Sequence, residues 1–178
     1  MITRKAPSGL APMESEKAMT IKVGDTIPSM KLMMATADGP KEVSTDDIFK
    51  GKKVVLFAVP GAFTPTCSAR HLPGFVQNAE AIKAKGVDSI VCIAVNDAFV
   101  MGAWGKDQGT GEKVMMVADG SAAFAKALGL EMDITARGMG VRSQRYALVA
   151  EDGKVTHLGV EAPGGFEASK AETILAAL

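Results

Sequence analysis

One cysteine, Cys67, lies in a segment whose residue types could activate it, PGAFTPTCSARHLPG (residues 60–74), directly after an aliphatic run. In a C-x-x-C redox motif a first thiol would stand at position 64, but Thr64 occupies it, so this turn cannot form a local disulfide. The segment instead predicts a single reactive thiolate near the start of a helix, where unpaired backbone N–H groups favour negative charge.

Such a thiolate needs more stabilisation than a helix terminus provides. A free thiol with a pKa near 8.5 is only about 3% ionised at pH 7. Lowering that pKa to roughly 6 takes about 3.4 kcal/mol, whereas a helix N-terminus supplies about 0.3–1 kcal/mol. A charged hydrogen-bond partner adds about 1.5–3 kcal/mol. A cation is therefore expected beside Cys67.

Five side chains are candidates for this cation: Arg70, His71, Arg137, Arg142 and Arg145. Arg145 is the best placed, because it directly precedes a strand that begins at Tyr146. A residue at the mouth of a strand can reach across the end of the sheet to the turn after a neighbouring strand. The alternative is that the last three arginines lie in a solvated loop. A lone histidine such as His71 is more often a packing or surface residue than a catalytic one.

The remaining sequence predicts alternating strands and helices. Apolar runs predict strands over residues 31–36, 53–59, 89–95 and 114–118, the middle two buried on both faces. Helices are expected over 98–106 and 121–128, and after Pro73, where Phe75, Ala79 and Ile82 share one stripe.

Turn and cap signals complete the prediction. Glu151-Asp152-Gly153 predicts a hairpin between strands 146–150 and 154–160. Ser44 with Asp47 predicts the cap of a short helix, and Ser169 with Glu172 a capping box for the last helix. This order indicates an α/β protein with a thioredoxin-like fold, a central mixed β-sheet flanked by helices.

Composition narrows the class of protein further. The chain has 178 residues, which suits one domain over residues 20–178 after an N-terminal arm, residues 1–19. Its 20 Lys and Arg balance 20 Asp and Glu, which argues against nucleic-acid or membrane partners. Two cysteines favour a reducing compartment. The arm could be a transit remnant, a tag scar or a disordered segment, so the expected location is cytoplasmic, or the matrix of a plastid or mitochondrion.

Several segments in order, PGAFTPTCS, HLPGF, VNDAFVMGAW, VADG and RSQRYALVAEDG, resemble the peroxiredoxins of the type II or type 5 subfamily, from about residue 23 to residue 178. The resemblance implies a thiol peroxidase that reduces hydrogen peroxide and alkyl hydroperoxides, with Cys67 as the nucleophile that becomes a sulfenic acid. The family's threonine, proline and distant arginine map to Thr64, Pro60 and Arg145. Thr64 and Arg145 would stabilise the departing oxygen, and Pro60 would shield the thiolate or simply terminate its strand.

The resemblance also implies partners. The expected reductant is an external thiol, either glutaredoxin with glutathione or thioredoxin, and the expected assembly is a homodimer; no cofactor or metal is implied. Cys92, inside SIVCIAV, is expected to be a small buried hydrophobic residue. Type II relatives have a cysteine at the matching place, so its participation in resolution stays an alternative.

Two other functions stay open from the sequence. One is a cysteine hydrolase that uses Cys67 with His71 or His157 as base. The other is a peroxide-sensing relay or chaperone-like binding protein, in which oxidation of Cys67 controls contacts with a partner.

Overall fold

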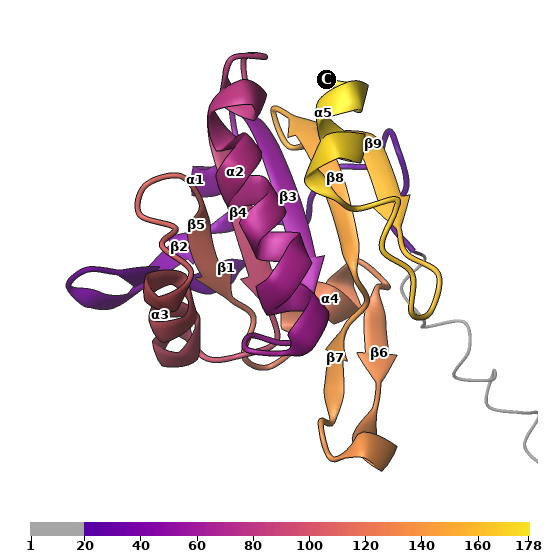
Figure 1. Cartoon of the computed structure of the whole chain (residues 1–178). Helices are drawn as coiled ribbons and strands as arrows, with labels where there is room; N and C mark the ends of the chain where they lie inside the picture. The colour runs from indigo at the N-terminus through magenta and orange to yellow at the C-terminus, as the bar shows by residue number, and fades with distance from the viewer. Residues whose placement is uncertain (1–19) are drawn as a thin grey trace, which may run out of the picture.

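Nine strands and five α-helices make up the computed structural model, which describes residues 20–178 (Figure 1). The predicted arm, residues 1–19, lies outside the described residues. The strands are β1 (Lys31–Thr36), β2 (Gly39–Ser44), β3 (Lys53–Val59), β4 (Ser89–Ala94), β5 (Met115–Ala118), β6 (Glu131–Asp133), β7 (Val141–Ser143), β8 (Tyr146–Glu151) and β9 (Lys154–Val160). The helices are α1 (Thr45–Phe49), α2 (Leu72–Lys83), α3 (Ala98–Asp107), α4 (Ala123–Ala127) and α5 (Ala171–Ala177).

Seven of these strands form one sheet in the order β2-β1-β5-β4-β3-β8-β9. Strands β3, β4 and β5 run parallel, whereas the pairs β1–β2, β1–β5, β3–β8 and β8–β9 are antiparallel. The predicted mixed sheet is therefore confirmed, together with the hairpin at its β8–β9 end. The short strands β6 and β7 form a separate two-stranded ribbon that projects from the body (Figure 1).

Helices cover both faces of the sheet, which explains the uninterrupted aliphatic run of β3. Val55, Phe57 and Val59 of that strand pack in a core cluster with α2, α3 and α5. The residues between them, Val54, Leu56 and Ala58, pack in a second cluster with α1 and α4. Side chains alternate between the faces of a strand, so both faces of β3 must be apolar.

The predicted stripe on α2 is confirmed. Phe75, Ala79 and Ile82 are fully buried in the first cluster. The ring of Phe75 stacks on that of Phe57 in β3, with centroids 4.0 Å apart and planes at 7°. This contact fixes α2, and the turn that precedes it, on strand β3.

Two cap predictions have opposite outcomes. Ser44 and Asp47 form the expected cap at the start of α1, and the structure shows it to be a capping box. The capping box at Ser169 is wrong, because the N-cap of α5 is Lys170 and no side chain caps it. The backbone of Ser169 is used elsewhere: its N–H donates to the Glu161 carboxylate at 2.9 Å. Helix α4 begins later than predicted, since Ala122 has a φ of +59°.

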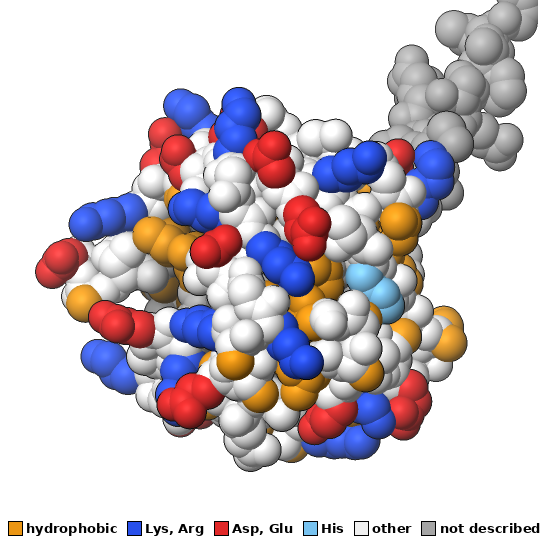
Figure 2. All heavy atoms as spheres, turned by 90° about the horizontal axis from the view of Figure 1, so that it is seen from above, with side chains coloured by type: hydrophobic (Ala, Val, Ile, Leu, Met, Phe, Trp, Pro, Cys, Tyr) orange, Lys and Arg blue, Asp and Glu red, His pale blue; other side chains and the backbone are white. Residues whose placement is uncertain are grey.

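Figure 2 shows acidic and basic side chains interspersed on the face seen there, in line with their equal numbers. Within residues 20–178, none of the helices has the length and apolar character needed to cross a bilayer.

Three strand ends meet at one edge of the sheet. Ala58, near the end of β3, pairs with Tyr146 at the start of β8, and Tyr146 pairs with Val160 at the end of β9. The segments that continue from these ends are the turn 60–64, residue Arg145 and the loop 161–169. Antiparallel pairing therefore brings together three parts of the chain that are far apart in sequence.

Candidate active site

The turn after β3 is held in an unusual conformation. Ala62 N–H donates to Asn96 Oδ1 at 2.9 Å, and Thr64 Oγ1 donates to Gly61 O at 2.7 Å. Phe63 has a φ of +62°, in the left-handed region that bulky residues rarely adopt. Such local strain persists only where surrounding contacts enforce it, and it is concentrated at functional sites.

Helical structure begins at Pro65 and contains one π-helical turn, Cys67–His71, before α2. In this turn Leu72 N–H donates to Cys67 O. Pro73 explains the widening, because proline has no N–H to donate to the carbonyl four residues earlier, and its ring clashes with that carbonyl in a regular helix. Single π turns of this kind occur frequently at functional sites.

Arg145 contacts the cysteine, as its position before β8 predicts. Its Nη2 donates to Cys67 Sγ at 3.1 Å, and its Nη1 lies 2.8 Å from His71 Nδ1. Cys67 and His71 are both fully buried. The guanidinium therefore joins the first and last residues of the π turn.

The other candidate arginines lie elsewhere. Arg142 Nε donates to Met139 O at 2.8 Å and its Nη1 to Pro60 O at 3.4 Å, so it braces the turn after β3. The Arg70 guanidinium lies 4.7 Å above the centre of the Phe166 ring. Arg137 is exposed at the tip of the β6–β7 ribbon.

His71 is not the cation that the sequence allowed. Its Nε2 lies 2.9 Å from Ser169 O, which can only accept, so Nε2 carries the proton and Nδ1 accepts from Arg145. Burial, followed by the positive charge of Arg145, lowers the pKa of His71 to about 3. The imidazole is therefore neutral, and neither nitrogen is free to act as a base toward Cys67. The contacts of His71 suit it to hold Arg145 in place, and they do not suit it to be the cation beside Cys67 or the base of a cysteine hydrolase.

Thr64 and Pro60 make no hydrogen bond to the Cys67 sulfur among the described contacts. The Thr64 hydroxyl donates its proton to Gly61 O, so it differs from the free donor that the sequence suggested. Its lone pairs stay available to accept a hydrogen bond from a bound molecule. Pro60 lines the cavity described next.

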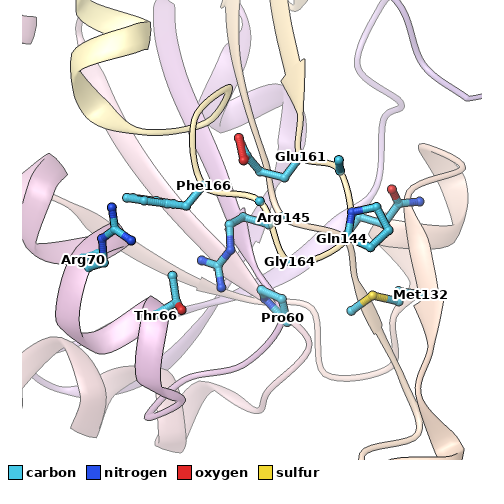
Figure 3. Close-up of a pocket in the computed structure, with 12 residues that line it drawn as sticks. Pro60, Thr66, Arg70, Met132, Gln144, Arg145, Glu161, Gly164 and Phe166 are labelled. Atoms are coloured by element: carbon cyan, nitrogen blue, oxygen red, sulfur yellow. The ribbon is translucent and has the colours of Figure 1, made fainter.

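A cavity of about 500 Å³ opens at this edge of the sheet. Its walls are Pro60, Thr66, Arg70, Met132, Gln144, Arg145, Glu161, Ala162, Pro163, Gly164, Gly165 and Phe166 (Figure 3). Cys67 is not among them. Its neighbour in sequence, Thr66, and its hydrogen-bond partner, Arg145, line the cavity.

Glu161 is a residue that sequence reasoning missed. Its carboxylate accepts the N–H of Glu167 at 2.8 Å and that of Ser169 at 2.9 Å, which closes the loop 161–169 upon itself. Ser169 O in turn accepts from His71. The only sequence signal was the glycine-rich stretch APGGF, which indicates a loop but not its contacts.

Cys92 lies in the middle of β4, paired with Phe57 on one side and Met116 on the other. It is fully buried and makes no disulfide with Cys67. Burial, followed by the nearby charge of Cys67, raises the pKa of the Cys92 thiol well above its ordinary value. Cys92 is therefore a protonated, buried residue, as its apolar strand predicts.

Comparison with known proteins agrees with this geometry. Residues 22–175 match the family model described as Redoxin. Peroxiredoxin-2B of Arabidopsis thaliana is 50% identical over 159 residues, covering 89% of this chain and 98% of that protein. The chloroplastic peroxiredoxin-2E of the same plant is 49% identical over 164 residues. The alignment covers 89% of this chain and 70% of that protein.

Solved structures give the same result. The crystal structure of reduced Prx3 from Vibrio vulnificus in complex with H2O2 superimposes with a TM-score of 0.85. The two sequences are 56% identical, and the match covers 89% of this chain and 99% of that one. Sequence, fold and family model agree over nearly all of the described residues. The chain therefore belongs to the peroxiredoxin family and is a thiol peroxidase with a thioredoxin fold.

Proposed function

We propose that Cys67 is the peroxidatic nucleophile of this thiol peroxidase, and that it reduces hydrogen peroxide and alkyl hydroperoxides with electrons from an external thiol. The observation that carries the proposal is the 3.1 Å hydrogen bond from Arg145 Nη2 to the buried Cys67 sulfur. A guanidinium at this distance is placed to stabilise the negative charge that moves between the sulfur and a departing oxygen. The H2O2 complex of the related Vibrio vulnificus protein supports peroxide as the substrate.

The oxidation step follows from this arrangement. The Cys67 thiolate attacks one oxygen of the peroxide, the S–O bond forms, and the O–O bond breaks. The electron pair leaves on the second oxygen, which takes a proton and departs as water or an alcohol. Cys67 is left as a sulfenic acid. Negative charge moves from sulfur to the departing oxygen, and Arg145 can donate to both.

Thr64 and Pro60 have supporting roles in this proposal. The Thr64 hydroxyl, fixed by its bond to Gly61 O, accepts a hydrogen bond from the peroxide and orients it for attack. Pro60 forms part of the cavity wall and limits access of water to the sulfur. Preorganised polar groups of this kind stabilise a transition state without having to reorganise during the reaction.

Reduction of the sulfenic acid requires two external thiols. The first forms a mixed disulfide with Cys67 and releases water, and the second regenerates the Cys67 thiol as the two external sulfurs join. Glutaredoxin with glutathione, or thioredoxin, supplies these electrons. The raised pKa of Cys92 supports an external donor, because a protonated thiol is a poor nucleophile.

A homodimer and the cell compartment complete the proposal. Phe63, 54% exposed in the strained turn, and Phe99, 75% exposed at the start of α3, support association through the face near the active site. The proposed location is cytoplasmic, or an organelle matrix if residues 1–19 are a transit remnant. The chloroplastic relatives support the second possibility.

Peroxide turnover by wild-type protein and Cys67→Ser tests the proposal. Each is assayed with glutaredoxin and glutathione and, separately, with thioredoxin. The wild type should turn over with at least one donor, whereas the serine variant should be inactive with both. Turnover by Cys67→Ser would contradict the assignment. A fast stoichiometric reaction of wild type with peroxide, without turnover under either donor, would favour the peroxide-sensing alternative.

A further inference from the structure

Trp104, the only tryptophan of the chain, lies close to the cysteine although it takes no part in the chemistry proposed above. It belongs to α3, which covers the same face of the sheet as α2 (Figure 1), and it is fully buried in the core cluster that contains Cys67. A buried indole N–H needs a hydrogen-bond acceptor. Here the acceptor is Ser68 Oγ, 3.0 Å from Trp104 Nε1. This bond ties α3 to the residue that directly follows the cysteine.

Trp104 also contacts the segment that precedes the cysteine. The centre of its ring system lies 6.5 Å from that of Phe63, with the two planes at 52°, a separation typical of interacting aromatic rings. Phe63 is the residue in the left-handed conformation, which persists only where surrounding contacts enforce it. One rigid side chain of α3 therefore contacts the chain on both sides of Cys67.

Helix α3 is itself held by the sheet. A Cβ added at Gly102 would lie 3.4 Å from Ala35 Cβ of β1. A Cβ added at Gly105 would lie 2.9 Å from Met116 Cγ of β5, which is closer than two non-bonded carbons approach. Position 105 therefore needs a glycine, because the helix packs so closely on the strand. The position of α3 is set by β1 and β5, independently of the turn that carries the cysteine.

The turn that receives the hydrogen bond is short of backbone contacts of its own. Ser68 N–H donates to Thr64 O at 3.0 Å, and Leu72 N–H donates to Cys67 O across the π turn. Pro73 has no N–H to donate, so the helix lacks one backbone hydrogen bond at this point. A bond from a side chain outside the turn therefore contributes to holding its conformation.

We propose that Trp104 and Ser68 are positioning residues for the reaction of Cys67, and that the indole N–H holds the π turn in the conformation that keeps the sulfur beside Arg145. This inference rests on the proposed function. Misplacement of a reacting atom by even 1 Å slows a reaction strongly, so the peroxide step needs this conformation. The Cys67 side chain is fully buried, so a larger thiol reagent reaches it only when the turn opens.

Loss of the hydrogen bond should therefore change two reactions of the same sulfur in opposite directions. The reaction with hydrogen peroxide should slow down, because the sulfur spends less time beside Arg145. The reaction with N-ethylmaleimide, a neutral thiol reagent larger than hydrogen peroxide, should speed up, because the turn opens more often. A residue that serves only the overall stability of the fold would not produce this opposition.

The test compares wild type with Ser68→Ala, which removes the acceptor, Ser68→Thr, which retains a hydroxyl, and the exposed control Ser121→Ala. All four proteins also carry Cys92→Ala, so that Cys67 is the only thiol. Rapid-quench kinetics measure both reactions. Ser68→Ala should lower the rate constant for peroxide about two- to tenfold and raise that for the maleimide by a similar factor, the range that one ordinary hydrogen bond gives. Ser68→Thr and Ser121→Ala should keep both wild-type rates.

The results separate this inference from the proposed function. Rates in Ser68→Ala that equal those of wild type, or that change in the same direction, would overturn the inference alone. Absence of any reaction between wild type and hydrogen peroxide would overturn the proposed function. In that case the single indole N–H signal of the protein still tests the bond by nuclear magnetic resonance. Its proton should shift upfield in Ser68→Ala, and an unchanged shift would show that Trp104 and Ser68 are not bonded in solution.

Discussion

Arg145 Nη1 and His71 Nδ1 lie 2.8 Å apart, and this hydrogen bond leaves the second guanidinium nitrogen directed at the cysteine sulfur. A neutral imidazole suits this task, because it accepts the hydrogen bond without adding a second positive charge. Its other nitrogen donates to Ser169 O. The position of the Arg145 guanidinium is thus set by a chain of contacts that begins in the loop after β9.

Arg145→Ala should slow the peroxide reaction by roughly 10²–10³-fold, the usual cost of removing a preorganised donor. Stopped-flow kinetics measure the rate of this reaction. Arg137→Ala, on the exposed ribbon tip, is the matched control. Unchanged values in Arg145→Ala, with large effects in Arg142→Ala, would mean that another arginine acts on the sulfur.

The stability of the protein should depend on pH through His71. Its pKa is about 3 in the folded protein and 6.5 ordinarily. Below pH 6.5 the unfolded chain therefore binds a proton that the folded protein does not, and the free energy of unfolding falls as the pH falls toward 3. The contribution is about 1.4 kcal/mol per pH unit across this window.

His71→Asn isolates this contribution, because an amide oxygen can still accept from Arg145 but does not titrate. Urea unfolding at a series of pH values should give a shallower decline for the variant than for wild type. Subtracting the two curves removes the contributions of groups that both proteins share. Parallel curves would show that His71 is already protonated in the folded protein or is not the source of the slope.

The fold was predictable where one physical signal dominated. The aliphatic run of β3 could only be a strand covered on both faces, and the loop Glu151-Asp152-Gly153 indicated its hairpin. Once β3 and β8 were placed, the position of Arg145 before β8 predicted that it would face the turn after β3. The ribbon β6–β7 was missed because each strand has only three residues, too few for a periodic pattern.

The contacts around His71 could not be predicted in the same way. A spacing of four residues from Cys67 indicates a shared helix face, but not that the helix widens to a π turn at that point. The role of Glu161 depends on backbone N–H groups six and eight residues later, in a loop without a repeating pattern. Such contacts arise from tertiary packing, which residue types alone do not encode.

Thr64→Val should slow peroxide reduction by about 10-fold or more, because it removes a polar contact worth about 1–3 kcal/mol in a buried site. Valine keeps the shape of threonine but loses the bond from Oγ1 to Gly61 O. Thr64→Ser, which retains a hydroxyl, should keep most of the rate. If the valine variant reacts at the wild-type rate, Thr64 serves only packing. Thermal unfolding of all three proteins controls for loss of structure.

The last prediction concerns the second cysteine. Cys92→Ala should keep most turnover with glutaredoxin and glutathione, because burial holds the Cys92 thiol protonated and a thiol must ionise to attack the sulfenic acid. Its place within β4, hydrogen-bonded to strands on both sides, also prevents it from approaching Cys67 without local unfolding. Alanine is preferred to serine here because it leaves no buried hydroxyl without a partner.

Mass spectrometry identifies the product that separates the two routes of reduction. After one equivalent each of peroxide and glutathione, wild type should carry a single glutathione on Cys67, and Cys92→Ala should carry the same adduct. Both sulfurs lie in one core cluster, so local unfolding of β4 or of the π turn would have to bring them together if the external thiol were slow. A stoichiometric Cys67–Cys92 disulfide in wild type, together with lost turnover in Cys92→Ala, would show that the chain resolves its own sulfenic acid.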